Sequence, residues 1–435
     1  MKLLLVTTML LSLNLSLASD TPTELIVKLK PGTNLPTLTN VKSVQNLFGT
    51  TYVLRTNDIK ALLNQLKNNP AIEYTERNHR SERRTLPLPD KNSTITSDKL
   101  NAQDSQFNDP LVSRVWSFLD AAQNGVSVNS AYKLYGTSNT SPVIVAVVDT
   151  GVDTQHEDLK DVIWKNPGEI PGNGIDDDNN GYIDDVYGIN TLIRDANGKA
   201  TVNNKDTHSH GTHVSGTIAA KQNNGIGIAG IASNVKIMGI RTVPNDGDET
   251  DVDVAEAFVY AAKNGAKIIN CSFGKSNNEG KRLIPDTLKY IADNYGVLVI
   301  AAAGNESSDI DKNPTYPASF DNANLLIIAA SSSGGGMSYF SNYGKINVDV
   351  AAPGSNIFST VPGNKYESMS GTSMATPTTV GVAAEILSHY PQLTYKQLKD
   401  VLINSVTKVD SFKNKMFSGG RIDLLKGLEN ASTIH

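Results

Sequence analysis

The chain has 435 residues, of which 39% are hydrophobic, 6% aromatic and 19% charged, a globular composition with room for one large domain and a small one. The net charge of −5 is uneven, because residues 20–99 carry 12 basic and 8 acidic side chains and the later residues are acidic overall. Two such parts are expected to attract each other. A nucleic acid is not expected as a partner, because its binding needs a basic surface.

Residues 1–19 have the pattern of a secretory signal peptide. One basic residue, Lys2, precedes an apolar run from Leu3 to Leu17, and small residues follow. Export is therefore predicted. No later apolar run approaches the ~20 residues of a membrane span, so we expect no span and a soluble mature protein. Cys271 is the one cysteine, so stability must come from the core or from bound metal rather than from a disulfide.

Residues 20–79 are predicted to form a small module, near the size at which a domain is only marginally stable alone. Two strands and a helix are expected in it, at residues 23–30, 71–75 and 58–68. Residues 80–107 lack periodicity and are predicted to be an exposed, cleavable linker. Within it, Arg83-Arg84 is either a dibasic processing point or a solvated basic run.

Strands and helices alternate through residues 108–435. Buried strands are predicted at residues 143–148, 235–240, 267–271, 297–302 and 325–330. Helices are predicted at residues 210–220, 251–263, 286–294, 373–389 and 394–405. This pattern indicates an α/β fold with a mostly parallel central sheet and helices on both faces. In such folds ligands bind at the carboxyl ends of the strands.

Three polar residues stand at the ends of these elements. Asp149 follows the strand at 143–148, His210 opens a helix, and Ser373 opens another between small residues. A serine nucleophile needs a base and an orienting acid, and these three could supply that set. Taken singly, Ser373 could be a helix cap and Asp149 a turn residue. His210 and His213 could ligate zinc, but no HExxH motif and no Glu or Cys completes such a set.

The chain order Asp, His, Ser is one of three known orders for one triad geometry. The segments VVDTG, HGTHVSG and SGTSMATP, which contain these residues, closely resemble the signatures of the subtilisin-like serine proteases. The resemblance runs from about residue 108 to the C-terminal end, and the preceding module is similar to that family's inhibitory propeptide. It implies that Ser373 is the nucleophile, His210 the general base and then acid, and Asp149 the orienter of His210. It implies a structural role for His213.

The same resemblance implies residues of the substrate cleft. Asn305, in the segment AAGN, would donate to the oxyanion beside the N–H of the nucleophile. The segment that pairs with substrate as an added strand would be Ser272, Phe273 and Gly274. The floor of the first specificity pocket would be Ala302, Ala303 and Gly304. The small floor residues predict a permissive pocket. Cys271 is expected to be a small buried residue rather than a catalytic thiol.

An acidic stretch at residues 245–253 departs from the family, which often has a glycine-rich rim there. One hypothesis is that it favours basic or neutral substrate residues a few positions before the scissile bond. The alternative is a solvated or calcium-attracting loop.

Two calcium sites are expected. Residues 176–185 place oxygen ligands at alternate positions, like the opening of an EF-hand loop. The ligands expected there are Asp176, Asp178, Asn180, Tyr182 and Asp185. The terminal Glu of that motif is missing, because Tyr187 stands there, so that Asp184 or Asp185 would substitute; the alternative is a polar surface insertion. The resemblance implies a second site, made by Asp109, Asp158, Asn224 and the carbonyls of Ile226 and Ile228.

The leading hypothesis is a secreted, monomeric, calcium-stabilised serine endopeptidase that cuts polypeptides and is made as an autoinhibited, self-processing precursor. A pseudoprotease that binds peptides without cutting them is the alternative. An esterase of the α/β-hydrolase type is disfavoured because Ala375 breaks the GxSxG elbow and the chain order differs. The N-terminal module is either an accessory domain or a propeptide, with processing expected between about residues 80 and 106.

Overall fold

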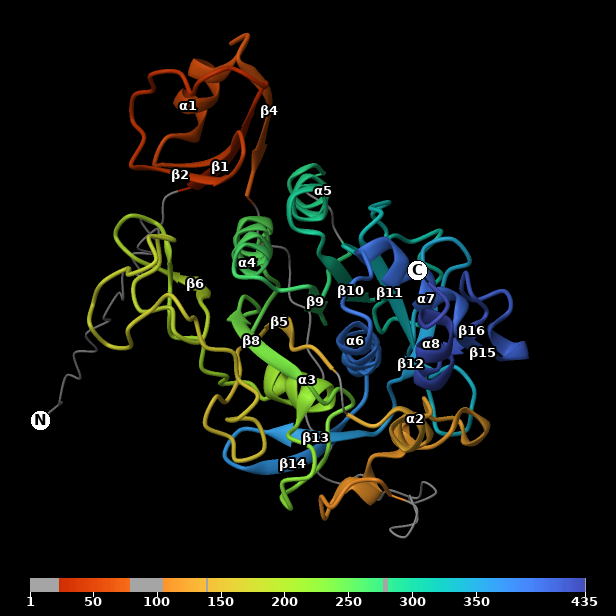
Figure 1. The fold of residues 1–435 in the computed structure, drawn as a ribbon. Coiled ribbons are helices and arrows are strands. Elements are labelled where there is room, and N and C mark those ends of the chain that lie inside the picture. Colours follow the sequence, from red (N-terminus) through yellow and green to blue (C-terminus); the bar gives the residue numbers. More distant parts are fainter. Residues whose placement is uncertain (1–22, 79–104, 138–139, 277–280, 435) are drawn as a thin grey trace, which may run out of the picture.

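The computed structural model describes residues 23–78, 105–137, 140–276 and 281–434. The predicted signal peptide and the Arg83-Arg84 segment lie outside the described residues. The described residues form a small N-terminal domain seated on a larger domain (Figure 1). Among them, no helix has the length and apolar character needed to cross a membrane.

The N-terminal domain is a four-stranded antiparallel sheet with one helix across it. Its elements are β1 Thr23–Leu29, β2 Ser43–Phe48, β3 Thr51–Thr56, α1 Ile59–Leu66 and β4 Ile72–Arg77. The strand order is β2-β3-β1-β4. The carboxylate of Asp58 caps α1 by accepting the N–H of Ala61 at 2.9 Å, and Leu62 and Leu66 bury that helix against the sheet. The sequence pattern predicted β1, α1 and β4 but not the hairpin of β2 and β3.

The larger domain is built on a ten-stranded sheet with the order β15-β16-β12-β11-β10-β9-β5-β8-β6-β7. The strands are β5 Val143–Asp149, β6 Asn190–Arg194, β7 Ala200–Thr201, β8 Val235–Arg241, β9 Ile268–Cys271, β10 Leu298–Ala302, β11 Leu325–Ser331, β12 Val350–Pro353, β15 Val406–Lys408 and β16 Gly420–Ile422. Every neighbouring pair is parallel except β6–β7 and β15–β16 at the two edges. The predicted mostly parallel α/β fold is confirmed.

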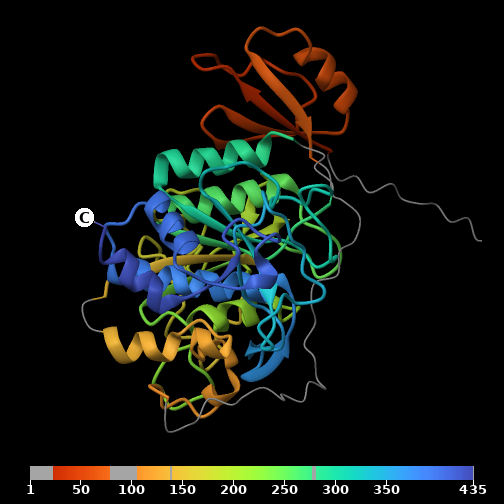
Figure 2. The same cartoon turned by 90° about the vertical axis from the view of Figure 1, so that its right-hand side faces the viewer.

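Helices cover both faces of this sheet (Figure 2). They are α2 Val128–Tyr135, α3 His210–Ala219, α4 Asp251–Lys263, α5 Leu283–Tyr295, α6 Thr372–His389, α7 Tyr395–Asn404 and α8 Leu424–Ala431. Successive residues of β5 belong to different cores: Val145 and Val147 pack with α3 and α6, whereas Ala146 and Val148 pack with α4 and α5. Two-sided burial explains the continuous apolar runs. A separate hairpin of β13 Ile357–Val361 and β14 Lys365–Met369 packs on α3.

The N-terminal domain rests on α4 and α5. The side-chain amide of Gln45 donates to Glu256 of α4 at 2.9 Å. The rings of Phe48 and Tyr290 have centroids 4.8 Å apart. The hydroxyl of Tyr74 donates to Asp286 of α5 at 2.9 Å. Beyond β4, Asn78 accepts the N–H of Val252 at 3.2 Å, so the chain leaves this domain at the start of α4.

Candidate active site

An acid and an imidazole meet at the end of β5. Asp149 is the last residue of that strand and His210 is the first of α3; both are buried. Nδ1 of His210 donates to Oδ1 of Asp149 at 2.7 Å, since a carboxylate can only accept. A Cβ at Gly211 would lie 2.0 Å from the carbonyl oxygen of Gly151, so glycine is required for α3 to approach β5 this closely. With the proton on Nδ1, Nε2 is the basic atom of the neutral ring.

Ser373 is the second residue of α6 and is 4% exposed. Its Oγ donates to the carbonyl of Ser272 at 2.9 Å, and the Oγ of Ser272 donates to the carbonyl of Ser373 at 2.9 Å. Ser272 follows β9, whose neighbour is β5, so the serine pair lies at the same sheet edge as Asp149. Nε2 of His210 is buried and has no partner among the described residues. The backbone N–H of Ser373 belongs to the first turn, where helical donors lack intrahelical acceptors.

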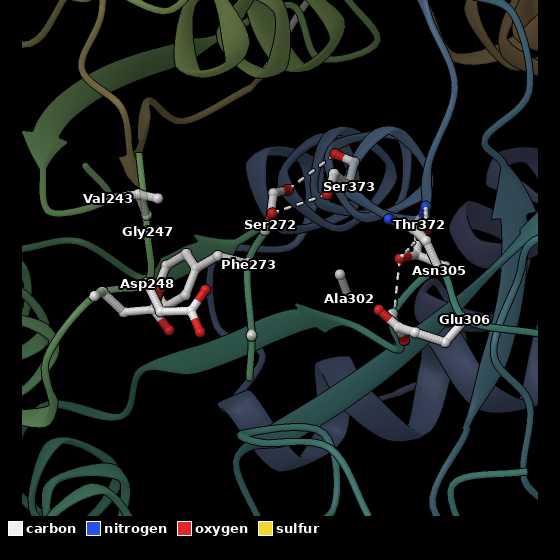
Figure 3. A pocket seen from close by; sticks show the side chains of 13 residues that line it. Val243, Gly247, Asp248, Ser272, Phe273, Ala302, Asn305, Glu306, Thr372 and Ser373 are labelled. Carbon is white, nitrogen blue, oxygen red and sulfur yellow. Dashed lines mark hydrogen bonds between the residues drawn. The ribbon is translucent and has the colours of Figure 1, made fainter. Parts of the chain in front are cut away.

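Asn305 lies beside the serine, just beyond the end of β10. Its Oδ1 accepts from the N–H of Thr372 at 2.8 Å and from the hydroxyl of Thr372 at 2.9 Å. Because a backbone N–H can only donate, these bonds fix the amide orientation and make Nδ2 the donor end. Figure 3 shows Asn305 next to Thr372, across the pocket from Ser272 and Phe273.

A cavity of about 260 Å³ lies at this edge of the sheet. The described residues that line it are Val243, Gly247, Asp248, Glu249, Ser272, Phe273, Gly274, Ala302, Gly304, Asn305, Glu306, Thr372 and Ser373. Five of the six predicted cleft residues are among them. Ala303 is not: its N–H donates to Ile328 at 3.0 Å and its carbonyl accepts from Asn342 at 2.9 Å, so it belongs to the sheet beneath the pocket.

Two other residues near the sheet edge, His213 and Cys271, have surroundings that favour a structural role over a catalytic one. Nε2 of His213 lies 2.9 Å from the carbonyl of Ile357, and burial lowers the pKa of this histidine to about 3. The ring is therefore neutral and donates to that carbonyl. Cys271 is fully buried, and burial raises the pKa of its thiol well above the usual value, which leaves no thiolate for nucleophilic attack.

The Asp-rich loop brings together two of the predicted ligands, Asp178 and Asp185, with a third carboxylate, Glu169, that the spacing did not predict. Oxygens of Glu169, Asp178 and Asp185 lie within 4.8 Å of one another. Asp176 instead accepts the backbone N–H groups of Asn180 at 3.0 Å and of Gly181 at 2.8 Å.

Asn180 lies beside this cluster. Its Nδ2 donates to Asp178 and to Asp185, both at 3.0 Å, while its Oδ1 accepts the N–H of Tyr182 at 2.8 Å. Burial raises the pKa of Asp185, and the charge of Asp178 adds to that effect. The donor set is made of hard carboxylate oxygens, which suit calcium.

The residues of the second predicted metal site also meet. Asp109 accepts the backbone N–H groups of Asn223 at 2.9 Å and of Asn224 at 3.2 Å. Asp158 accepts from the side-chain amide of Asn224 at 2.8 Å and from the N–H of Ile228 at 2.9 Å. Burial raises the pKa of Asp158 to about 6, and the negative charge of Asp109 adds to the effect. A bound cation would offset the repulsion between the negative charges of these two carboxylates.

Ile226 belongs to the same turn, where its N–H donates to Oδ1 of Asn224 at 2.8 Å. Three contributors to these sites were missed by sequence reasoning. Glu169 lies outside the loop motif, and the missing Glu at the motif's end was the only hint of it. Glu306 and Thr372 flank Asn305 and Ser373, so adjacency to those two residues was the available signal.

Comparisons with known proteins agree on one family. The profile of the subtilase family matches residues 140–420. Subtilisin-like protease 1 of Plasmodium berghei is 35% identical over 358 residues, which cover 78% of this chain and 57% of that protein. This chain therefore matches little more than half the length of that relative. Thermitase of Thermoactinomyces vulgaris is 34% identical over 72% of this chain and 98% of its own length.

A solved structure extends the likeness to nearly the whole chain. Fervidolysin from Fervidobacterium pennivorans, described as a keratinolytic enzyme related to subtilisin, aligns with a TM-score of 0.70 at 24% identity. The alignment covers 94% of this chain and 61% of that one, an extent that cannot be reached without the N-terminal domain. At this identity the match shows the fold alone. With the family profile spanning residues 140–420 and relatives above 30% identity, the chain belongs to the subtilase family.

Proposed function

We propose that the protein is a serine endopeptidase that hydrolyses peptide bonds through an acyl-enzyme on Ser373. The observation that carries the proposal is the 2.7 Å bond from His210 to Asp149 in a buried setting, with Nε2 of His210 left as a base near a pocket that contains Ser373. Asp149 holds the ring in the tautomer that can accept a proton and stabilises the imidazolium once it forms.

In the first step Oγ of Ser373 attacks the scissile carbonyl carbon while its proton passes to Nε2 of His210. This requires the hydroxyl to leave the carbonyl of Ser272, to which it donates in the free site. The C–N bond then breaks, and His210 gives its proton to the leaving amine. In the second step His210 takes a proton from water while the water oxygen bonds to the acyl carbon. The bond between the acyl carbon and Oγ of Ser373 then breaks, His210 returns the proton to Oγ, and the carboxylic acid product leaves.

The negative oxygen of each tetrahedral intermediate needs donors that are already in place. Nδ2 of Asn305 and the backbone N–H of Ser373 are suited to this role. The N–H and the hydroxyl of Thr372 both donate to Oδ1 of Asn305, and these two hydrogen bonds limit rotation of the amide. The first turn of α6 adds the positive end of a helix dipole of 18 residues.

A serine-directed phosphonate probe tests the nucleophile without a knowledge of the substrate. The processed protein should lose activity as one phosphonate adds to Ser373, located by peptide mass analysis. A Ser373→Ala variant should take up none, and a Ser388→Ala variant should react like the parent. A parent protein that stays unlabelled would support the peptide-binding pseudoprotease instead.

We further propose that the N-terminal domain is an inhibitory propeptide. Its contact with α4 and α5 is both apolar and polar: Phe48 stacks near Tyr290, and Gln45 and Tyr74 each bond to a carboxylate of the larger domain. Asn78, beyond β4, accepts the N–H of Val252 at 3.2 Å, so the chain leaves this domain beside the loop that lines the pocket. The small size of the domain fits a transient folding aid rather than an independent module.

We also propose that calcium stabilises the fold and that the protein is exported. Glu169, Asp178 and Asp185 would hold one ion, with Asp176, Asn180 and Tyr182 completing the loop around it. Asp109, Asp158 and Asn224 would hold another. The bound ion would offset the repulsion between buried carboxylates. In an exported chain with a single cysteine, it would supply stability that a disulfide cannot.

A further inference from the structure

The loop that carries Asn305 belongs to neither a strand nor a helix. It follows β10 and comprises residues 304–308, of which Gly304 and Ser307 have left-handed backbone conformations, with φ +105° and +55°. The regular hydrogen bonds of a sheet or a helix do not hold such a loop, so its polar groups need other partners. The position of Nδ2 of Asn305, the proposed oxyanion donor, therefore depends on the contacts that hold this loop.

Asn342 makes hydrogen bonds on both sides of Asn305. Its side chain is fully buried. Nδ2 of Asn342 donates to the carbonyl of Ala303 at 2.9 Å and to Oε2 of Glu306 at 2.6 Å. Its Oδ1 accepts the N–H groups of Glu306 at 3.0 Å and of Ser308 at 2.9 Å. One side-chain amide therefore holds residues before and after the proposed oxyanion donor.

The backbone of Asn342 adds a further contact with the loop. Its N–H donates to the carbonyl of Gly304 at 2.9 Å. A Cβ at Gly304 would lie 2.4 Å from Nδ2 of Asn342, so glycine allows the amide to pack this closely against the loop. Because backbone N–H groups can only donate, the two bonds to Oδ1 fix the amide orientation and leave Nδ2 as the donor. Alanine at this position would lose all four side-chain bonds.

Two threonines also hold the loop, but only on one side of Asn305. Oγ1 of Thr315 donates to the carbonyl of Ala303 at 3.1 Å, and the N–H of Gly304 donates to Oγ1 of Thr372 at 3.1 Å. Both bonds act on residues that precede Asn305. Asn342 is not among the described residues that line the pocket, so any effect that it has on the reaction must pass through the loop.

We propose that Asn342 is a positioning residue for the oxyanion donor. It holds the loop so that Nδ2 of Asn305 is already in place when the negative oxygen of the tetrahedral intermediate forms, and it does not itself contact the reacting atoms. Donors that are in place before the reaction stabilise the intermediate without any cost of reorganisation. A displacement of about 1 Å can lower a rate by about 10²-fold. This role rests on the proposed peptidase function.

A double-mutant cycle in the processed enzyme tests this role. Asn342→Ala should lower kcat about 10- to 100-fold and change KM by less than about two-fold, because the amide that it positions acts on the intermediate. In the Asn305→Ala protein, the same substitution should lower kcat by less than about two-fold, since the donor is already gone. Residues that act independently would instead show effects on kcat that multiply. Steady-state kinetics on one peptide gives all four kcat values.

Asn324→Ala is the matched control. Asn324 is also a buried asparagine, and its Nδ2 donates to the carbonyls of Leu288 at 3.0 Å and of Val297 at 3.1 Å, at the end of β10 away from the pocket. This variant should lose stability in thermal unfolding and keep the kcat of the parent. End-point labelling with the phosphonate counts the folded sites in every variant. Asn342→Ser, which keeps a shorter polar group, should show a smaller loss of kcat with the same dependence on Asn305.

An unchanged kcat in Asn342→Ala would overturn the positioning role, and so would effects that multiply in the cycle or an equal loss of kcat in Asn324→Ala. If neither Asn342 variant takes up the phosphonate while Asn324→Ala does, Asn342 is needed for folding, and the positioning role is again overturned. These outcomes leave the peptidase standing. Failure of the parent to cut any peptide, together with its failure to react with the phosphonate, would instead overturn the proposed function.

Discussion

At the scale of single residues, the site depends on two side chains that each bond to a neighbour through one polar atom and keep the other polar atom for the reaction. His210 uses Nδ1 for Asp149, so Nε2 is the base. Asn305 uses Oδ1 for Thr372, so Nδ2 is the donor. In both cases a neighbour that can only accept, or only donate, fixes the orientation of an ambiguous ring or amide. The chemistry therefore follows from hydrogen-bond partners as much as from the identities of the residues.

Replacing Asn305 by Ala should lower kcat by about 10²–10³, the loss known for removing this kind of donor in a subtilisin, with little change in KM. The amide acts on the intermediate rather than on the bound substrate, so the effect belongs in kcat. Steady-state kinetics on one peptide measures both constants. Asn313→Ala, an exposed asparagine in the same loop, should behave like the parent. An unchanged kcat in Asn305→Ala would remove this residue from the mechanism.

His213 gives a prediction about pH. Its folded pKa, about 3, lies below its usual 6.5 because the ring is buried. A depressed folded pKa means that the unfolded chain binds the proton more readily, so this residue destabilises the protein as pH falls from about 6.5 toward 3. In the Ser373→Ala protein, the His213 ring resonances should not shift between pH 7 and 4.5. A resonance that titrates near pH 6 would show that the ring is accessible to protons.

At the scale of elements, the parallel strands bring together residues that are far apart in sequence. The register pairs Val148 of β5 with Cys271 of β9, and Ala301 of β10 with the same Cys271. The residues that follow these strands therefore converge at one edge of the sheet. The strand pattern predicted that Asp149 and Asn305 lie at strand ends, whereas the place of Ser272 in the cleft was expected from the resemblance to the family.

Other elements could not be predicted, for identifiable reasons. The strands β12 and β16 have only four and three residues, too few for a periodic signal. The hairpin of β13 and β14 depends on contact with α3, which no local pattern encodes. Ala303 was expected at the pocket from the resemblance to the family, yet its backbone is bonded into the sheet beneath the pocket. Glu169 and Glu306 needed the folded chain to reveal their neighbours.

The Asp-rich loop should bind calcium as an element. Calcium at about 100 times its dissociation constant should stabilise the folded protein by about 2.7 kcal/mol, and EDTA should remove that gain. Glu169→Gln and Asp185→Asn should each reduce the stoichiometry by one ion in isothermal titration, while Glu429→Gln keeps it. Asp158→Asn should remove a different ion. An unaltered stoichiometry in the first two variants would show that this carboxylate cluster is not a calcium site.

At the scale of the whole molecule, a basic N-terminal part meets an acidic larger domain. The contact is specific as well as electrostatic, because Glu256 of α4 accepts from Gln45 of the N-terminal domain and from Tyr182 of the Asp-rich loop, at 2.9 and 3.0 Å. Arg194 pairs with the same glutamate at 2.5 Å. Docking of the N-terminal domain therefore involves the same glutamate that anchors the proposed calcium loop.

The central claim is that Ser373 makes this chain a peptidase that processes itself. The most direct measurement is the intact mass of the precursor lacking residues 1–19, incubated with calcium beside a Ser373→Ala twin. The account predicts that the parent loses its N-terminal domain with a cut between about residues 80 and 106, while the twin keeps its full mass. Equal processing of both proteins would contradict this claim. The claim would also be contradicted if neither protein is processed and the parent does not react with the phosphonate.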